Sequence, residues 1–194
     1  VLTEVRGVFV RAMAEWALGQ ILAFAKGVPD NVEAQAAREW RYRSVRRVCD
    51  QRALVVGTGS IGTETGRLLR AVGMHVDGVG RRARDGGNAF SQLFGVADLD
   101  GLLPDYDYVV LVAPLTESTR GMFGADQFAA MSDSAVFINM GRGALVDEPA
   151  LVAALKSEAI AGAGLDVFMV EPLPSDSAIR DAPNCLLSPH NSGD

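Results

Sequence analysis

The sequence contains only two cysteines among its 194 residues, Cys49 and Cys185, and they lie far apart. Two cysteines are too few for a disulfide framework, and their spacing is unlike that of a zinc site. We therefore expect no metal. Each cysteine is interpreted as a small buried apolar residue rather than as a nucleophile.

The chain also lacks an excess of basic residues. Its 18 lysines and arginines are outnumbered by 24 aspartates and glutamates, which gives a net charge of −6. Nucleic-acid-binding proteins usually show a basic excess or stripe, so we expect no nucleic-acid partner. The one basic cluster, Arg38 to Arg52, lies in a polar stretch and is interpreted as a solvated surface.

Long uninterrupted hydrophobic runs are missing as well. The longest apolar stretch, Val8 to Ala25, is interrupted by Arg11, Glu15 and Gln20. A spanning helix needs about 20 consecutive apolar residues, and no signal-peptide pattern is found. We therefore expect no membrane contact and a cytoplasmic location.

The composition that is present fits a globular protein. Hydrophobic residues make up 48% and charged residues 22%, as in ordinary soluble α/β domains. A length of 194 residues suits one domain and is too short for two full ones. Residues 1–194 are accordingly interpreted as one domain.

Residues 1–50 are predicted to form a helical segment. A helix is expected from Val8 to Lys26, ended by Gly27 and Pro29, and a second from Val32 to Arg41, indicated by the start signature Asp30–Glu33. The first helix is apolar around most of its circumference. Two interpretations stay open: burial in the core of this chain, or packing of one side on a partner chain.

After this segment, short apolar runs alternate with helical patterns. Alternation at this spacing indicates βαβ units and a parallel sheet covered on both sides. The predicted fold class is α/β, a Rossmann-like doubly wound parallel sheet in three layers. The predicted strands are Ala53–Val56, His75–Val79, Tyr108–Ala113, Ala135–Asn139, Gly162–Val167 and Cys185–Ser188, and the helices between them are Ser60–Val72, Ala125–Met131 and Pro149–Ser157.

A GxGxxG motif, Gly57 to Gly62, directly follows the first predicted strand and opens a predicted helix. That context is the one a dinucleotide-binding motif requires. Gly57 allows a tight turn, Gly59 lets the backbone approach a pyrophosphate, and Gly62 lets the helix pack closely on the strand. The alternatives are a ligand-free turn or the glycine-rich turn of some methyltransferases.

Charged residues gather at the ends of the later strands, on the side of the glycine motif. Arg142, Asp166, Glu171 and His190 all fall there, whereas His75 starts a strand on the opposite side. A histidine can give a proton to a ketone oxygen during hydride transfer. A carboxylate bonded to its other nitrogen fixes the tautomer, and an arginine can bind a substrate carboxylate with two parallel bonds.

The chain resembles the D-isomer-specific 2-hydroxyacid dehydrogenases, with glyoxylate and hydroxypyruvate reductases among them. The stretches that carry the resemblance are "VVGTGSIGTETGRLLRAVGMHV", "APLTESTRGMF", "INMGRGALVDEPALVAAL", "AGAGLDVFMVEPLP" and "LLSPHNSGD". They have the order and spacing of the family and cover nearly the whole chain. The resemblance implies an NAD(P)-dependent oxidoreductase that acts on a small 2-keto or 2-hydroxy acid.

Residue roles follow from the same resemblance. Arg142 would bind the substrate, Glu171 would be the partner acid and His190 the general acid/base. Asp166 would hold the nicotinamide carboxamide, and the helix near Trp16 would lie at a homodimer interface. The cofactor-binding set comprises Gly57, Gly59, Ser60, Ile61, Gly62, Gly80, Arg81, Arg82, Ala113, Pro114, Thr119, Met140, Gly141, Arg142, Asp166 and His190.

The sequence departs from the family pattern in two ways. The family's N-terminal substrate domain has no counterpart here, so we expect a nucleotide-binding domain that binds cofactor and turns over poorly or not at all alone. In NAD-preferring relatives an aspartate stands where this chain has Gly80. Gly80 removes a charge that would repel a 2′-phosphate, and Arg81 and Arg82 can bind one, so NADP is expected over NAD.

Two other functions share this scaffold. One is an NAD(P)(H)-sensing protein without substantial turnover, like the C-terminal-binding protein corepressors. The other is formate or phosphite oxidation. Formate enzymes usually carry glutamine as the partner of the histidine, so Glu171 argues against formate oxidation.

Overall fold

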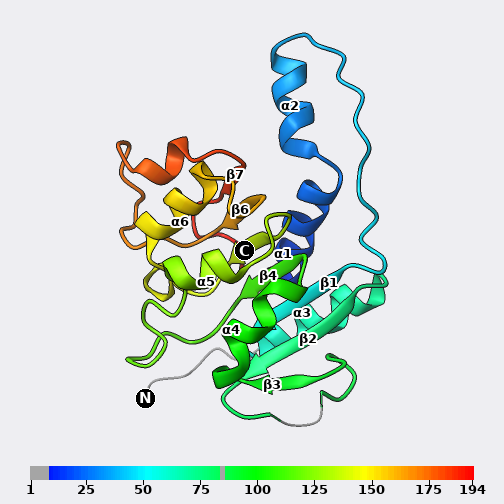
Figure 1. Cartoon of the computed structure of the whole chain (residues 1–194), viewed down its shortest axis with the longest axis vertical. Helices are drawn as coiled ribbons and strands as arrows, with labels where there is room; N and C mark the ends of the chain where they lie inside the picture. Colours follow the sequence, from blue (N-terminus) through cyan, green and yellow to red (C-terminus); the bar gives the residue numbers. More distant parts are fainter. Residues whose placement is uncertain (1–8, 84–85) are drawn as a thin grey trace.

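The computed structural model describes residues 9–83 and 86–194. Its seven-stranded sheet is parallel throughout, with the order β3-β2-β1-β4-β5-β6-β7 (Figure 1). The order reverses between β1 and β4, as in doubly wound nucleotide-binding folds, and confirms the predicted fold class. The strands are β1 (Arg52–Val56), β2 (His75–Gly80), β3 (Leu93–Gly95), β4 (Tyr108–Leu111), β5 (Val136–Asn139), β6 (Gly162–Leu165) and β7 (Cys185–Leu187).

Helices cover both faces of this sheet. One face carries α1 (Val10–Ala25) and α3 (Ser60–Ala71). The other carries α4 (Leu99–Leu102), α5 (Ala125–Ala130) and α6 (Glu148–Lys156). Single-turn helices occupy the connections: η1 (Val96–Asp98), η2 (Leu103–Asp105), η3 (Gly143–Leu145) and η4 (Ala178–Asp181).

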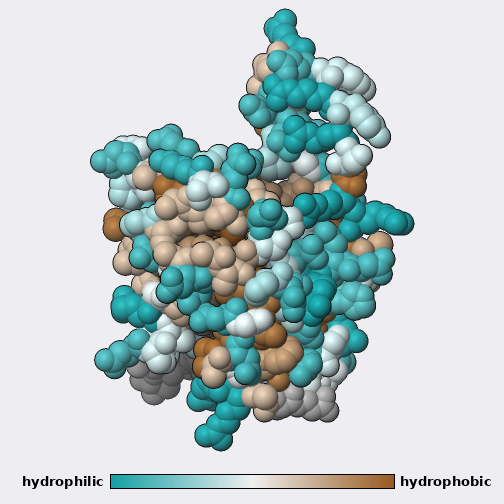
Figure 2. Space-filling view, in the orientation of Figure 1, coloured by the Kyte–Doolittle hydropathy of each residue, from teal (hydrophilic) through white to brown (hydrophobic). Residues whose placement is uncertain are grey.

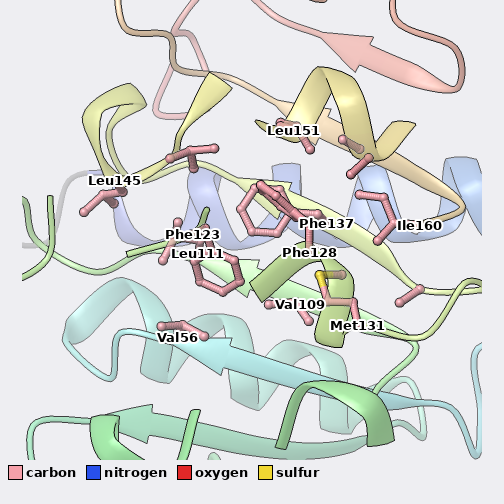
Figure 3. Packing of buried hydrophobic residues seen from close by; sticks show 14 of the residues in the cluster. Val56, Val109, Leu111, Phe123, Phe128, Met131, Phe137, Leu145, Leu151 and Ile160 are labelled. Atoms are coloured by element: carbon pink, nitrogen blue, oxygen red, sulfur yellow. The ribbon is translucent and has the colours of Figure 1, made fainter. Parts of the chain in front are cut away.

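Alternation along each strand fills the two layers of core. In β1, Leu54 and Val56 point into the cluster beneath α4–α6, while Ala53 and Val55 point into the cluster beneath α1 and α3. This is the period-2 geometry of a strand buried on both faces. The α4–α6 cluster is built around three phenylalanine rings, with Phe137 centred 4.9 Å from Phe123 and 5.2 Å from Phe128 (Figure 3).

The first helix was expected either to be buried in the core of this chain or to pack on a partner chain, and the structure decides part of this. Ala14, Ala17 and Ile21 of α1 are fully buried, so this helix belongs to the core of its own chain. The second helix, α2, spans Val28–Ala36 and stands away from the sheet (Figure 1). The projecting end of the molecule is covered largely by hydrophilic residues (Figure 2).

The observed bounds of α2 differ from the prediction of Val32–Arg41. Gly27 adopts a left-handed conformation (φ +62°) and Pro29 lies in the first turn of the helix. Proline suits that position because its fixed φ is helical and its missing N–H would be unpaired there anyway. The glycine that ends α1 is therefore followed at once by the start of α2.

Strand β3 and helix α4 were not predicted. β3 has three residues and pairs with β2 at the edge of the sheet, and α4 has four residues. Elements this short carry too few residues for a periodic pattern. No helix in residues 9–83 and 86–194 is long and apolar enough to cross a membrane.

Candidate active site

In the glycine turn after β1, packing within the chain requires glycine at two of the three positions. Gly57 has a φ of +113°, and a Cβ there would lie 2.5 Å from the backbone nitrogen of Ala113. A Cβ on Gly62 would strike the carbonyl of Gly57. At Gly59, by contrast, a Cβ would have no atom within 4 Å beyond its own chain neighbours. Gly59 is thus free of internal crowding, as expected where a ligand approaches the backbone.

The loop after β4 lies directly beside the glycine turn. The Val112 N–H donates to the carbonyl of Val56 at 2.8 Å, which joins the ends of β4 and β1. Beyond it, the Thr119 hydroxyl donates to the Pro114 carbonyl at 2.7 Å and accepts from the Thr116 N–H at 2.8 Å. Thr119 fixes the shape of this loop, and Pro114 is exposed along it.

The end of β2 presents the predicted phosphate-binding arginines. Gly80 closes the strand, and Arg81 and Arg82 follow it with exposed side chains. Within residues 9–83 and 86–194 neither arginine forms an ion pair. Residues 84 and 85, which follow these arginines, lie outside the described residues.

Three neighbouring strand ends carry the predicted catalytic side chains. Arg142 follows β5, Glu171 follows β6 and His190 follows β7, and these strands are adjacent in the sheet. His190 Nδ1 lies 2.6 Å from Glu171 Oε2, so the predicted pair forms. The His190 side chain is 47% exposed and its backbone is left-handed, with φ +56°.

Glu171 is held as a carboxylate. Burial would raise its pKa, but hydrogen bonds from His190 and from the Phe168 N–H, at 2.9 Å, outweigh burial and hold the pKa below its usual value. A carboxylate can only accept hydrogen bonds. The shared proton therefore sits on Nδ1 of His190, and Nε2 is the nitrogen that can face a substrate.

The loop after β5, which carries Arg142, is held by hydrogen bonds with the Asn139 side chain. The sequence patterns did not single out Asn139. The Asn139 side-chain oxygen accepts from the Gly141 N–H at 3.0 Å, and its amide donates to the Arg142 carbonyl at 3.3 Å. The Arg142 side chain is exposed and donates to the Gly141 carbonyl at 2.6 Å. A polar residue closing a buried strand was the available signal.

Asp166, predicted to hold the nicotinamide carboxamide, is bonded within its own chain in the structure. The residue is 0% exposed. Its carboxylate accepts from the Ser188 hydroxyl, from the Asn191 N–H at 3.0 Å and from the Ser192 N–H at 2.9 Å. Burial would raise the pKa of Asp166, yet these hydrogen bonds lower it. The carboxylate thus ties the loop that carries His190 to the end of β6.

Met140, another residue of the predicted cofactor-binding set, has a buried side chain. It is 0% exposed and packs in the cluster beneath α1 and α3, so its side chain has no surface to offer a cofactor. Its position directly after a strand end suggested contact, but alternation turns this residue into the core. Gly141 is likewise buried, whereas Ser60 is exposed and Ile61 half-buried at the start of α3.

The family follows from comparison of the sequence with known families. The NAD-binding domain of the D-isomer specific 2-hydroxyacid dehydrogenases matches residues 18–192. The chain belongs to this family. The matching family model describes an NAD-binding domain, and the uncrowded side of Gly59 is compatible with the approach of a pyrophosphate.

Named relatives of this dehydrogenase domain are reductases. Over 198 residues the chain is 37% identical to glyoxylate/hydroxypyruvate reductase B of Enterobacter agglomerans, covering 98% of the chain and 60% of that protein. Identity reaches 58% with the protein of the same name from Citrobacter koseri, over 48% of the chain and 29% of that protein. The chain thus spans less than two thirds of the length of these relatives.

Solved structures of other family members superpose closely. The NADPH-dependent glyoxylate/hydroxypyruvate reductase of Sinorhizobium meliloti, in complex with NADP and sulfate, matches with a TM-score of 0.89 at 32% identity, covering 98% of the chain and 61% of that structure. A D-isomer specific 2-hydroxyacid dehydrogenase from Xanthobacter autotrophicus, in complex with NADPH and MES, matches with a TM-score of 0.86 at 36% identity, covering 95% and 58%.

Proposed function

We propose that the protein reduces a small 2-keto acid, such as glyoxylate or hydroxypyruvate, to the 2-hydroxy acid, using NADP(H). The observation that carries the proposal is the 2.6 Å pair of His190 and Glu171 at the same sheet edge as the glycine turn. Three of the relatives named above are glyoxylate/hydroxypyruvate reductases.

Each residue of the site has a separate role in the proposed reaction. The nicotinamide, when bound, supplies the hydride that C2 of the keto acid receives. Arg142 binds the carboxylate and polarises the carbonyl, because a guanidinium forms parallel bonds to carboxylate oxygens. His190 gives the Nε2 proton to the carbonyl oxygen, and Glu171 stabilises the charged imidazole through Nδ1. The carbonyl gains one hydride and one proton, which yields the alcohol.

The cofactor preference rests on the end of β2. Gly80 places no charge near the adenosine ribose, and Arg81 and Arg82, which form no ion pair with any described residue, supply two donors for a 2′-phosphate. A hydrogen bond to a charged group contributes on the order of 1.5–3 kcal/mol. One such contact therefore favours NADP(H) over NAD(H) by roughly ten- to a hundredfold.

A homodimer is also proposed, but the residues that support it differ from those expected from the sequence. Trp16, the expected interface residue, packs partly buried against the core. Trp40 and Tyr42, in the segment that follows α2, are 99% and 90% exposed. Large aromatic side chains are enriched at protein interfaces, so we assign the dimer contact to this segment.

The experiment compares the chain with the corresponding full-length protein. Both are titrated with NADPH and NADH, and both are assayed with a panel of 2-keto acids. We expect both to bind NADPH and the full-length protein to oxidise it in the presence of substrate, while the chain alone turns over poorly. Cofactor binding by the full-length protein with no turnover of any keto acid would favour a sensor instead.

A further inference from the structure

Two glycines lie on one face of β2, and the backbone conformation of the strand does not explain why glycine is present at these positions. Gly78 and Gly80 are two positions apart, so a side chain on either would point to the same side of the sheet. Glycine weakens a strand, because it adds no packing and loses the most freedom on folding. Neither glycine has a positive φ. The remaining reason for glycine is the close approach of another group.

That group is the side chain of Thr58, the second residue of the glycine turn. A Cβ on Gly80 would lie 2.7 Å from Thr58 Oγ1, and the next nearest atoms, at 3.8 Å, also belong to Thr58. A Cβ on Gly78 would lie 3.0 Å from Thr58 Cγ2. Ordinary contacts between such atoms are about 3.5–4.0 Å. Thr58 thus lies along the end of β2 in the space that side chains there would need.

The same side chain borders the proposed 2′-phosphate site. Thr58 stands between Gly57 and Gly59 in the turn, and it faces Gly80, which Arg81 follows. Gly78 is crowded by further residues, with Leu93 Cδ2 at 2.5 Å from its Cβ position, whereas Thr58 supplies all three nearest atoms at Gly80. Thr58 is therefore the residue that limits the space for a side chain at position 80. This is the position where NAD-preferring relatives have their carboxylate.

We propose that Thr58 is a specificity-determining residue that excludes a strand-end carboxylate at position 80 by shape and so keeps the ribose site open to the 2′-phosphate of NADP(H). The inference rests on the proposed function. It implies that an aspartate at position 80 is not enough to convert the site to NAD(H). The Cβ of that aspartate would lie 2.7 Å from the Thr58 hydroxyl oxygen, so the Thr58 side chain, the strand end or the turn would have to move.

The test measures NADPH and NADH affinity by fluorescence titration of the chain and three variants. Gly80→Asp should weaken NADPH binding about tenfold or more, through repulsion of the phosphate, without strengthening NADH binding. Adding Thr58→Ala removes the hydroxyl, and this double variant should bind NADH about tenfold more tightly than Gly80→Asp alone. The matched control, Thr58→Val with Gly80→Asp, keeps an atom in the crowded place and should behave like Gly80→Asp.

Thermal unfolding without cofactor provides a second readout. Gly80→Ala adds only the crowded Cβ, so it should lower the Tm when Thr58 is present and lower it clearly less in the Thr58→Ala background. Equal Tm changes in the two backgrounds, or equal NADH affinity of Gly80→Asp with and without Thr58→Ala, would overturn the inference. If wild type binds neither dinucleotide, the proposed function fails and the specificity role with it. If wild type binds NADPH but the variant effects are additive, this inference alone fails.

Discussion

Replacing Asp166 with asparagine separates two roles for this carboxylate. In the structure Asp166 is fully buried and accepts three hydrogen bonds, two of them from backbone N–H groups of the His190 loop. An asparagine amide turns an N–H₂ toward the Ser192 N–H or the Asn191 N–H, so at least one buried donor loses its acceptor. We expect a loss of on the order of 2–3 kcal/mol in the free energy of unfolding.

That loss corresponds to a Tm lower by about 4–12 °C, because a chain of this size shifts about 2–4 °C per kcal/mol. It should also depend on pH. The pKa of Asp166 is lower in the folded protein than its ordinary value of 3.8. The carboxylate therefore stabilises the fold fully above that value, and its contribution is lost as the pH falls through the folded pKa. The Tm difference between wild type and variant should shrink in acid.

The matched control is Asp147→Asn. Asp147 caps α6, with its carboxylate accepting from the Ala150 N–H at 3.1 Å, and asparagine caps a helix about equally well. This variant carries the same change of charge but should keep the wild-type Tm within about 2 °C. The reasoning fails if Asp166→Asn unfolds like wild type yet binds NADPH less tightly, since that pattern would return Asp166 to the cofactor.

Three further predictions concern the proposed function. In the full-length protein, His190→Ala should lower kcat with glyoxylate by about 10²–10⁴ and Glu171→Gln by less, and an unchanged kcat for His190→Ala would remove it from catalysis. Arg81→Ala and Arg82→Ala, compared in NADPH and NADH titrations, should each reduce the NADPH-to-NADH affinity ratio, one of them by roughly tenfold or more; an unchanged ratio in both would exclude a phosphate contact. Trp40→Ala should weaken dimerisation in analytical ultracentrifugation, and a wild-type association constant would place the dimer contact elsewhere.

The fold could be predicted because its signals are local. The apolar run Ala53–Val56, followed at once by the glycine turn, marks a buried strand and the helix after it without knowledge of any distant residue. Strand β3 was not predicted because its three residues form a strand only by pairing with β2, a contact that the local sequence does not indicate. The α2 bounds were wrong because Pro29, a residue also typical of helix ends, lies in its first turn.

The site was predictable to the extent that topology decides it. Parallel strands deliver their carboxyl ends to one edge, which brought Glu171 and His190 together as expected. Which strand-end residues face outward is a different matter. Asp166 is buried because the chain from Ser188 to Ser192 folds over it, and Met140 is buried because alternation turns it inward. Both depend on tertiary contacts that spacing does not reveal.

The loops that carry the proposed catalytic residues are tied to one another by contacts inside this chain. The β5 loop meets the β6 loop at Gly143, where a Cβ would strike the Phe168 backbone, and Asp166 joins the β6 end to the β7 loop. Such ties hold a site in place before ligands bind. His190 and Glu171 are thus positioned without help from a second domain. If the chain binds NADPH but turns over poorly, we attribute the deficit to the substrate's surroundings, because the His190–Glu171 pair proposed to donate the proton is already formed.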